Sequence, residues 1–108
     1  METADSHNQF ELILTIVNAG FSEKVMDSAR RHGAGGGTVL RGRGTNADSR
    51  NLFGISVDPE KDVVLIVARK NNCVPIMEAI NEAVGLKTRG NGICFVLPVD
   101  NVVGISLE

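Results

Sequence analysis

Apolar positions along this chain alternate between short continuous runs and segments with helical spacing. Residues 11–18 (Glu-Leu-Ile-Leu-Thr-Ile-Val-Asn) are aliphatic and rich in β-branched side chains, which is typical of a strand. A helix is expected to begin at Ser22, a candidate N-cap, and to end at Gly33, which follows three basic residues. Residues 37–43 then predict a second strand.

The same scheme recurs 51 positions later. Residues 62–68 predict a strand, and Asn72 is a candidate cap for a second helix with Pro75 in its first turn. Gly85 is expected to end that helix, and residues 93–97 predict the last strand. Apolar residues four apart give the helix one apolar face: Ile76, Ile80 and Val84. Two tandem β-α-β units predict an α+β, ferredoxin-like β-α-β-β-α-β fold, with an antiparallel four-stranded sheet and both helices on one face.

The strand patterns also make a prediction about assembly. Residues 12–17 and 63–68 are apolar at nearly every position, so both faces of the sheet require burial. Two helices cover only one face, and soluble monomers rarely expose an apolar patch of this size. We therefore expect a homo-oligomer in which sheets pack against one another.

Length and charge narrow the class of protein. A chain of 108 residues is long enough for one domain, which we expect over residues 10–108, with a flexible tail over residues 1–9. The net charge of −2 argues against a nucleic-acid binder, and no apolar run is long enough for direct membrane insertion. The polar tail is no signal peptide, and Cys73 and Cys94 are expected to be reduced, so we expect a cytoplasmic protein.

Groups for catalysis or metal binding are sparse. The sequence holds two histidines, His7 and His32, and no Ser/His/Asp or Cys/His grouping can be recognised. We therefore expect no catalytic residues, no metal site and no catalytic cofactor, and we interpret the protein as a non-enzyme.

Glycine is the residue whose distribution points to a binding site. Six of the twelve glycines lie in residues 33–44, and Gly90 and Gly92 flank the start of the last predicted strand. Neither a Walker loop nor a dinucleotide fingerprint fits their spacing. The long segment 45–61 follows the first glycine cluster, and loops of that length are usually functional or mobile. We expect the end of the second strand and the start of the last to lie on adjacent edges of the domain, so that the two glycine segments converge.

Two of these segments resemble a known family. Residues 90–103 (Gly-Asn-Gly-Ile-Cys-Phe-Val-Leu-Pro-Val-Asp-Asn-Val-Val) resemble the G-D-G-K-I-F-V-x-P-V-x-D-V-V signature of the PII signal-transduction proteins. Residues 36–44 resemble the segment that leads to the mobile T-loop of that family. The order of strands and helices agrees as well, so the resemblance covers residues 11–105, and the chain is similar to a divergent PII-like protein.

The resemblance implies a function. It implies a homotrimer that binds an adenine nucleotide (AMP, ADP or ATP) as an effector in clefts between subunits. The T-loop, here about residues 45–61, would then dock on a regulated transporter or metabolic enzyme, in the control of nitrogen metabolism. The residues that we expect at the nucleotide site are Gly36, Gly37, Thr38, Gly42, Arg43, Gly44, Thr45, Arg89, Gly90, Asn91 and Gly92.

Several positions depart from the family pattern. Ile93 stands where the family has a phosphate-binding Lys, and Thr45 where it has an Arg. The two C-terminal arginines of the family are Gly104 and Ser106 here. Because charge-assisted contacts contribute about 1.5–3 kcal/mol each, these changes favour a nucleotide with few phosphates or another adenylyl ligand. Two alternatives remain open: an interaction scaffold without nucleotide binding, and a trimer that binds a small ligand or a metal.

Overall fold

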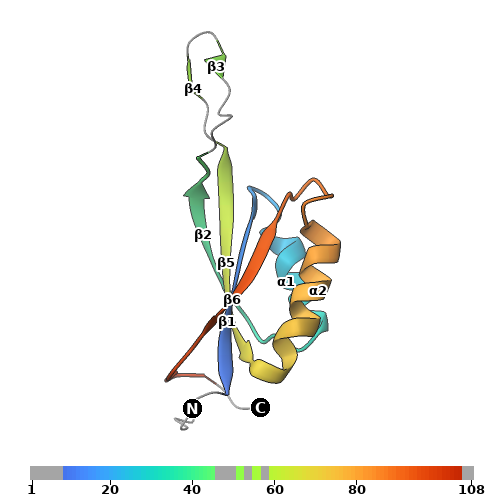
Figure 1. Ribbon diagram of the computed structural model, residues 1–108, viewed down its shortest axis with the longest axis vertical. Coiled ribbons are helices and arrows are strands. Elements are labelled where there is room, and N and C mark those ends of the chain that lie inside the picture. The colour runs from blue at the N-terminus through green and yellow to red at the C-terminus, as the bar shows by residue number, and fades with distance from the viewer. Residues whose placement is uncertain (1–8, 46–50, 53–54, 57–58, 106–108) are drawn as a thin grey trace.

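The computed structural model describes residues 9–45, 51–52, 55–56 and 59–105. Its main sheet has the strand order β2-β5-β1-β6, and every neighbouring pair is antiparallel (Figure 1). A separate two-stranded pair, β3-β4, lies in the segment between β2 and β5. The strands are β1 (Phe10–Asn18), β2 (Thr38–Arg43), β3 (Asn51–Leu52), β4 (Ile55–Ser56), β5 (Glu60–Arg69) and β6 (Ile93–Pro98).

Two helices lie together on one side of the main sheet (Figure 1). Helix α1 (Ser22–Arg31) follows β1, and helix α2 (Cys73–Val84) follows β5 through a short 3₁₀ turn, η1 (Lys70–Asn72). This is the predicted ferredoxin-like arrangement, and the predicted fold class is confirmed. No helix in the described ranges has the length and apolar character that a membrane span requires.

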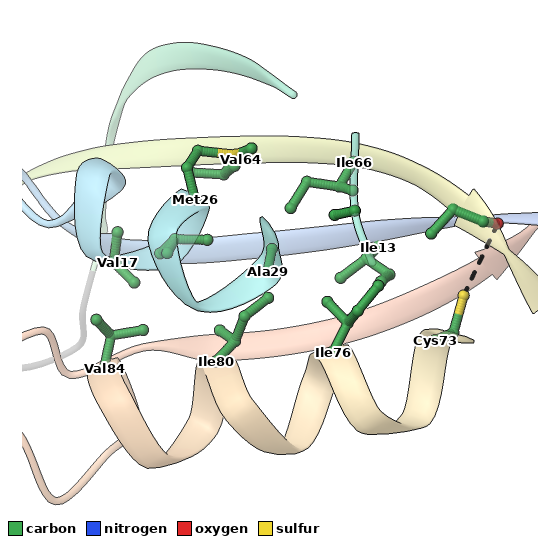
Figure 2. Close-up of a cluster of buried hydrophobic side chains, with 13 residues drawn as sticks. Ile13, Val17, Met26, Ala29, Val64, Ile66, Cys73, Ile76, Ile80 and Val84 are labelled. Atoms are coloured by element: carbon green, nitrogen blue, oxygen red, sulfur yellow. Dashed lines mark hydrogen bonds between the residues drawn. The ribbon is translucent and has the colours of Figure 1, made fainter. Parts of the chain in front are cut away.

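The core lies between this helical layer and the sheet (Figure 2). The predicted apolar face of α2 is confirmed, because Ile76, Ile80 and Val84 are at most 1% exposed. They pack among buried side chains from β1, β5 and α1, including Ile13, Val17, Met26, Ala29, Val64 and Ile66. The two helices are thereby fixed against the sheet, and so are the loops at their ends.

Both predicted helix caps are wrong in detail. Ser22 is the first residue of α1, while Phe21 occupies the N-cap position and makes no side-chain cap. Asn72 occupies the N-cap position of α2, but its side chain makes no capping hydrogen bond. Gly33 ends α1 as expected, with a left-handed φ of +105° that favours glycine.

The N-terminal tail was predicted over residues 1–9. Residues 1–8 lie outside the described ranges, but Gln9 is held in place, because its carbonyl accepts a hydrogen bond of 2.9 Å from the Lys70 backbone N–H. Gln9, which was predicted to belong to the tail, is therefore attached to the domain.

The face of the sheet opposite the helices is apolar, as the strand patterns predict. Cross-strand partners share a face, and on this face Leu14 lies between Leu65 of β5 and Phe95 of β6. The other large side chains on the face are Leu12, Ile16, Leu40, Val63, Val67, Ile93 and Leu97. Leu40 and Ile93, on the two edge strands, are 50% and 55% exposed. One chain alone leaves this face uncovered by helices.

Candidate functional site

The two glycine segments do not lie on adjacent edges, contrary to the prediction. Gly42 and Gly44 lie at the end of β2, and Gly90 and Gly92 precede β6, and these strands form opposite edges of the sheet. Both segments do lie at the same end of the sheet, because all three strand pairs are antiparallel, so that β2 ends where β6 begins. Strands β5 and β1 lie between them, a separation of about 14 Å at 4.8 Å per strand.

Asn18, at the end of β1, links the two segments through hydrogen bonds. Its backbone N–H donates to the Gly90 carbonyl at 2.8 Å, and its side-chain Nδ2 donates to the Arg89 carbonyl at 2.8 Å. On the other side, Lys61 Nζ donates to Asn18 Oδ1 at 2.7 Å. The Lys61 stem passes close to Gly44, where an added Cβ would lie 3.2 Å from Lys61 Cε. One asparagine thus connects the base of the β2–β5 segment to the loop before β6.

Arg41, a neighbouring cation, is held by two carboxylates. Its Nε donates to Asp62 Oδ1 at 3.0 Å, and its Nη1 donates to Glu60 Oε2 at 2.8 Å. Asp62 is 4% exposed, and its second oxygen accepts a hydrogen bond of 2.9 Å from the Gly20 backbone N–H. The Arg41 guanidinium is therefore committed to structure at the end of the sheet.

Close packing alone accounts for several of the predicted site glycines. A Cβ on Gly90 would lie 2.8 Å from Val84 Cβ, and one on Gly92 would lie 2.6 Å from the Val84 carbonyl oxygen. A Cβ on Gly37 would lie 2.8 Å from Met26 Sδ. The contacts with Val84 leave no room for a side chain at Gly90 or Gly92, and at Gly37 the Leu65 carbonyl oxygen at 3.0 Å adds to the conflict with Met26, so packing accounts for these three glycines without a ligand.

Gly35 and Gly36 are different. An added Cβ at either position would meet no atom within 4 Å, and neither residue has a left-handed φ. Both line a cleft of about 600 Å³ beside the start of β2. Within the described part of the chain, neither backbone makes a hydrogen bond. Two glycines that packing does not require therefore expose their backbone to a cleft.

The cleft combines an apolar wall with polar side chains and exposed glycine backbone. The wall comes from the outer ends of β1 and β5: Phe10, Leu65, Val67 and Ala68. Arg69 and Asn72 line the cleft from the turn that follows β5, and the Arg69 guanidinium lies 5.5 Å from the centre of the Phe10 ring. Thr38, Gly104 and Ile105 complete the lining, together with the glycines that precede β2.

The predicted site residues fall into three places in one chain. Gly36, Gly37 and Thr38 line the cleft. The second group, Gly42 to Thr45, lies at the far end of β2, about 17 Å from Thr38 at 3.3 Å per residue. The third group, Arg89 to Gly92, lies before β6 at the opposite edge. Asn91 in this loop has a left-handed φ of 46°, a conformation that asparagine tolerates better than most residues.

Comparison with known proteins supports the resemblance found in the sequence. The family model "Nitrogen regulatory protein P-II" matches residues 10–108. The chain belongs to the nitrogen regulatory protein P-II family. Among solved structures, Arabidopsis thaliana PII bound to citrate matches at 27% identity and a TM-score of 0.71, over 90% of this chain and 83% of that one. No curated protein matches the chain.

Membership makes this a PII-like regulatory protein. Proteins of the P-II family form trimers and act on partner proteins. The structure locates two departures from the family pattern. Ile93, in place of the family Lys, is 55% exposed on the open face of the sheet across from Ile16. Gly104, in place of a family Arg, lines the cleft, whereas Ser106 lies outside the described ranges.

Of the residues that line the cleft, the sequence predicted Gly36, Gly37 and Thr38; those that it missed include Phe10, Arg69 and Asn72. They come from the start of β1, the end of β5 and η1, segments that only the fold brings together. No motif marks them, and Asn72 was assigned to a helix cap. The structure shows that the Asn72 side chain makes no capping hydrogen bond to α2, and the sequence alone cannot show this.

The two thiols are unsuited to nucleophilic chemistry. Burial, with a smaller effect from Glu11, raises the pKa of Cys73 to about 11. Its Sγ faces the Ala68 carbonyl at 4.0 Å (Figure 2). Burial also raises the pKa of Cys94, although the Thr15 hydroxyl, which donates to its sulfur at 3.4 Å, partly offsets the effect. Both cysteines are free, and the described residues contain no group of three or more His, Cys, Asp or Glu that is able to hold a metal ion.

Proposed function

We propose that this chain is a PII-like sensor that binds an adenine nucleotide with few phosphates and signals to a transporter or metabolic enzyme through the 45–61 segment. The observation that carries the proposal is the exposure of Gly35 and Gly36 in the cleft. Neither packing nor backbone conformation requires glycine there, and a flat base can approach the bare backbone closely.

The lining of the cleft supports a base rather than phosphates at this position. Phe10, Leu65 and Val67 give the cleft an apolar side against which a base can pack, and ligand sites combine such surface with polar groups that fix orientation. Other cations lie toward the far end of the sheet: Arg43 and Lys61 on the neighbouring strands β2 and β5, and Arg89 before β6 at the opposite edge. Leu65 and Lys61 are four residues apart on β5, about 13 Å at 3.3 Å per residue. A nucleotide lying along β5 would direct its phosphates toward these cations.

Few phosphates are favoured because cations are missing where they are needed. Ile93 and Thr45 replace charged residues of the family pattern, and Arg41 is held by Asp62 and Glu60. Each missing charge-assisted contact lowers triphosphate affinity more than monophosphate affinity, because the outer phosphates depend on them. We therefore infer that AMP or ADP binds at least as tightly as ATP.

A homotrimer would complete the site. The open apolar face favours burial against other copies of the chain, and the exposed edges β2 and β6 lie on opposite sides of the sheet. In a closed ring, one edge of each copy meets the other edge of its neighbour. That contact would bring the Gly42–Thr45 end of β2 of one subunit beside the Arg89–Gly92 loop of the next, uniting two groups that a single chain keeps apart at the same end of the sheet.

Isothermal titration of the purified protein with AMP, ADP and ATP, with and without Mg²⁺, tests the proposal. Gly36→Leu should abolish binding by filling the cleft, and no atom lies within 4 Å of the Cβ that it adds. Glu82→Leu adds the same side chain to an exposed position of α2 and should bind like the wild type. Because the Arabidopsis relative binds citrate, citrate is titrated as well. Absence of heat with every nucleotide would refute nucleotide sensing.

One observation favours a second candidate, an interaction scaffold without nucleotide binding. Gly37, Gly90 and Gly92 are explained by contacts within the chain, so the family-like glycines can persist without a ligand. This candidate predicts no binding of nucleotide by the wild type. Gly36→Leu would then leave capture of the target protein unchanged.

A further inference from the structure

Asn72 is a polar residue whose type the fold does not explain. Asparagine at an N-cap normally has extended backbone and accepts a hydrogen bond from the first turn of the helix. Here Asn72 has a helical backbone (φ −96°, ψ −10°), and its side chain makes no cap bond. Within the described part of the chain, the side-chain amide has no hydrogen-bond partner.

The position of the Asn72 side chain in the cleft suggests a role in ligand binding. Asn72 lines the cleft with Gly33, Gly35 and Gly36. A Cβ at Gly33 would lie 3.2 Å from Asn72 Nδ2, so a side chain at position 33 would press on the amide. An amide carries two donor hydrogens and one acceptor oxygen, and Asn72 brings these groups to the lining of the cleft beside Gly33.

We propose that Asn72 recognises the edge of adenine that carries the amino group, and so discriminates against guanine; this inference rests on the nucleotide binding proposed above. The amide oxygen accepts from the adenine N6 amino group while Nδ2 donates to N7, the pairing that asparagine makes with adenine in nucleic-acid recognition. Guanine presents two acceptors on the corresponding edge, so the Asn72 oxygen would face another acceptor. The bidentate pairing corresponds to roughly a 10- to 100-fold preference.

Titration of the full chain with AMP and GMP tests this role. The wild type should bind AMP roughly 10- to 100-fold more tightly than GMP. Asn72→Ala should lose most of that preference by weakening AMP, with GMP affinity changed by less than about threefold. Asn71→Ala is the matched control, because Asn71 lies in the same turn, is exposed and does not line the cleft. It should keep both affinities. The ratio of AMP to GMP affinity is the decisive readout, since a purely structural loss weakens both.

Each outcome is decisive. If the wild type binds AMP and GMP equally, or if Asn72→Ala weakens both alike, the role of Asn72 is refuted while nucleotide binding stands. If the wild type binds neither, the proposed function fails and this inference with it. Should Asn72→Ala unfold below the assay temperature, Asn72→Asp replaces it. That variant keeps the size of the side chain, cannot donate to the ring nitrogen, and should lose the same preference.

Discussion

Arg41 pairs with two carboxylates in very different settings, and the shorter ion pair should contribute less stability. The Arg41–Glu60 pair spans 2.8 Å, but both side chains are more than 60% exposed. Solvent screening and side-chain entropy limit such pairs to about 0–1 kcal/mol. The Arg41–Asp62 pair spans 3.0 Å, yet the Asp62 side chain is only 6% exposed. Asp62 also accepts from the Gly20 backbone, so it satisfies donors on two elements.

The comparison is made with two isosteric substitutions. Asp62→Asn turns one acceptor into a donor facing Arg41 or Gly20, and it removes a charge-assisted bond. The expected loss in the free energy of unfolding is about 1.5–3 kcal/mol. Glu60→Gln leaves an exposed group that water can solvate, and its expected cost is below about 1 kcal/mol.

Urea unfolding at fixed pH and fixed protein concentration measures both variants, because oligomer stability depends on concentration. The small effect of Glu60→Gln should shrink further in 0.5 M NaCl, while that of Asp62→Asn should persist. A cost for Glu60→Gln equal to or above that of Asp62→Asn would refute the reasoning from burial.

Three further predictions concern packing, pH and assembly. Gly92→Ala should destabilise the protein by about 1–3 kcal/mol through its clash with the Val84 carbonyl, and Gly35→Ala should change the thermal midpoint little; equal midpoints would contradict the close-packing account. Because burial raises the pKa of Cys73 from 9.0 to about 11, its contribution to stability should be complete below pH 9 and fall as pH rises toward 11; Cys73→Ala should remove that part of the pH dependence of urea unfolding. Phe95→Glu should place a charge on the open sheet face and dissociate the proposed trimer in light scattering, and an intact trimer would count against that face as the interface.

Local patterns predicted the elements because their signals are local. The aliphatic runs of β1 and β5 and the four-residue spacing from Ile76 to Val84 depend on neighbours in sequence, and the four strands of the main sheet and both helices were found within about two residues. The short strands β3 and β4 were not predicted. Caps were less predictable. Ser22 has a common cap residue type, but its backbone is already helical, so its side chain cannot act as the N-cap.

The arrangement of the candidate site depended on information that the linear pattern lacks. The strand order separates the end of β2 from the start of β6, so the predicted adjacent edges are opposite ones. The cleft joins Phe10, Arg69 and Asn72 from three segments, and no spacing rule relates them. The number of glycines was also a poor guide to ligand contacts. Gly90 and Gly92 are required by close packing against Val84, whereas packing does not explain Gly35 and Gly36.

The placement of β2 and β6 on opposite edges has a genetic consequence for the proposed ring. Each interface between two copies would combine the β2 side of one copy with the β6 side of the next. An inactivating substitution in the cleft and one in the Arg89–Gly92 loop would therefore damage different sides of the interface. A ring made of one mutant alone has no interface with both sides undamaged. A ring that mixes the two mutants has one interface in which both sides are undamaged. Two inactive alleles of such a protein would therefore complement each other when expressed in the same cell.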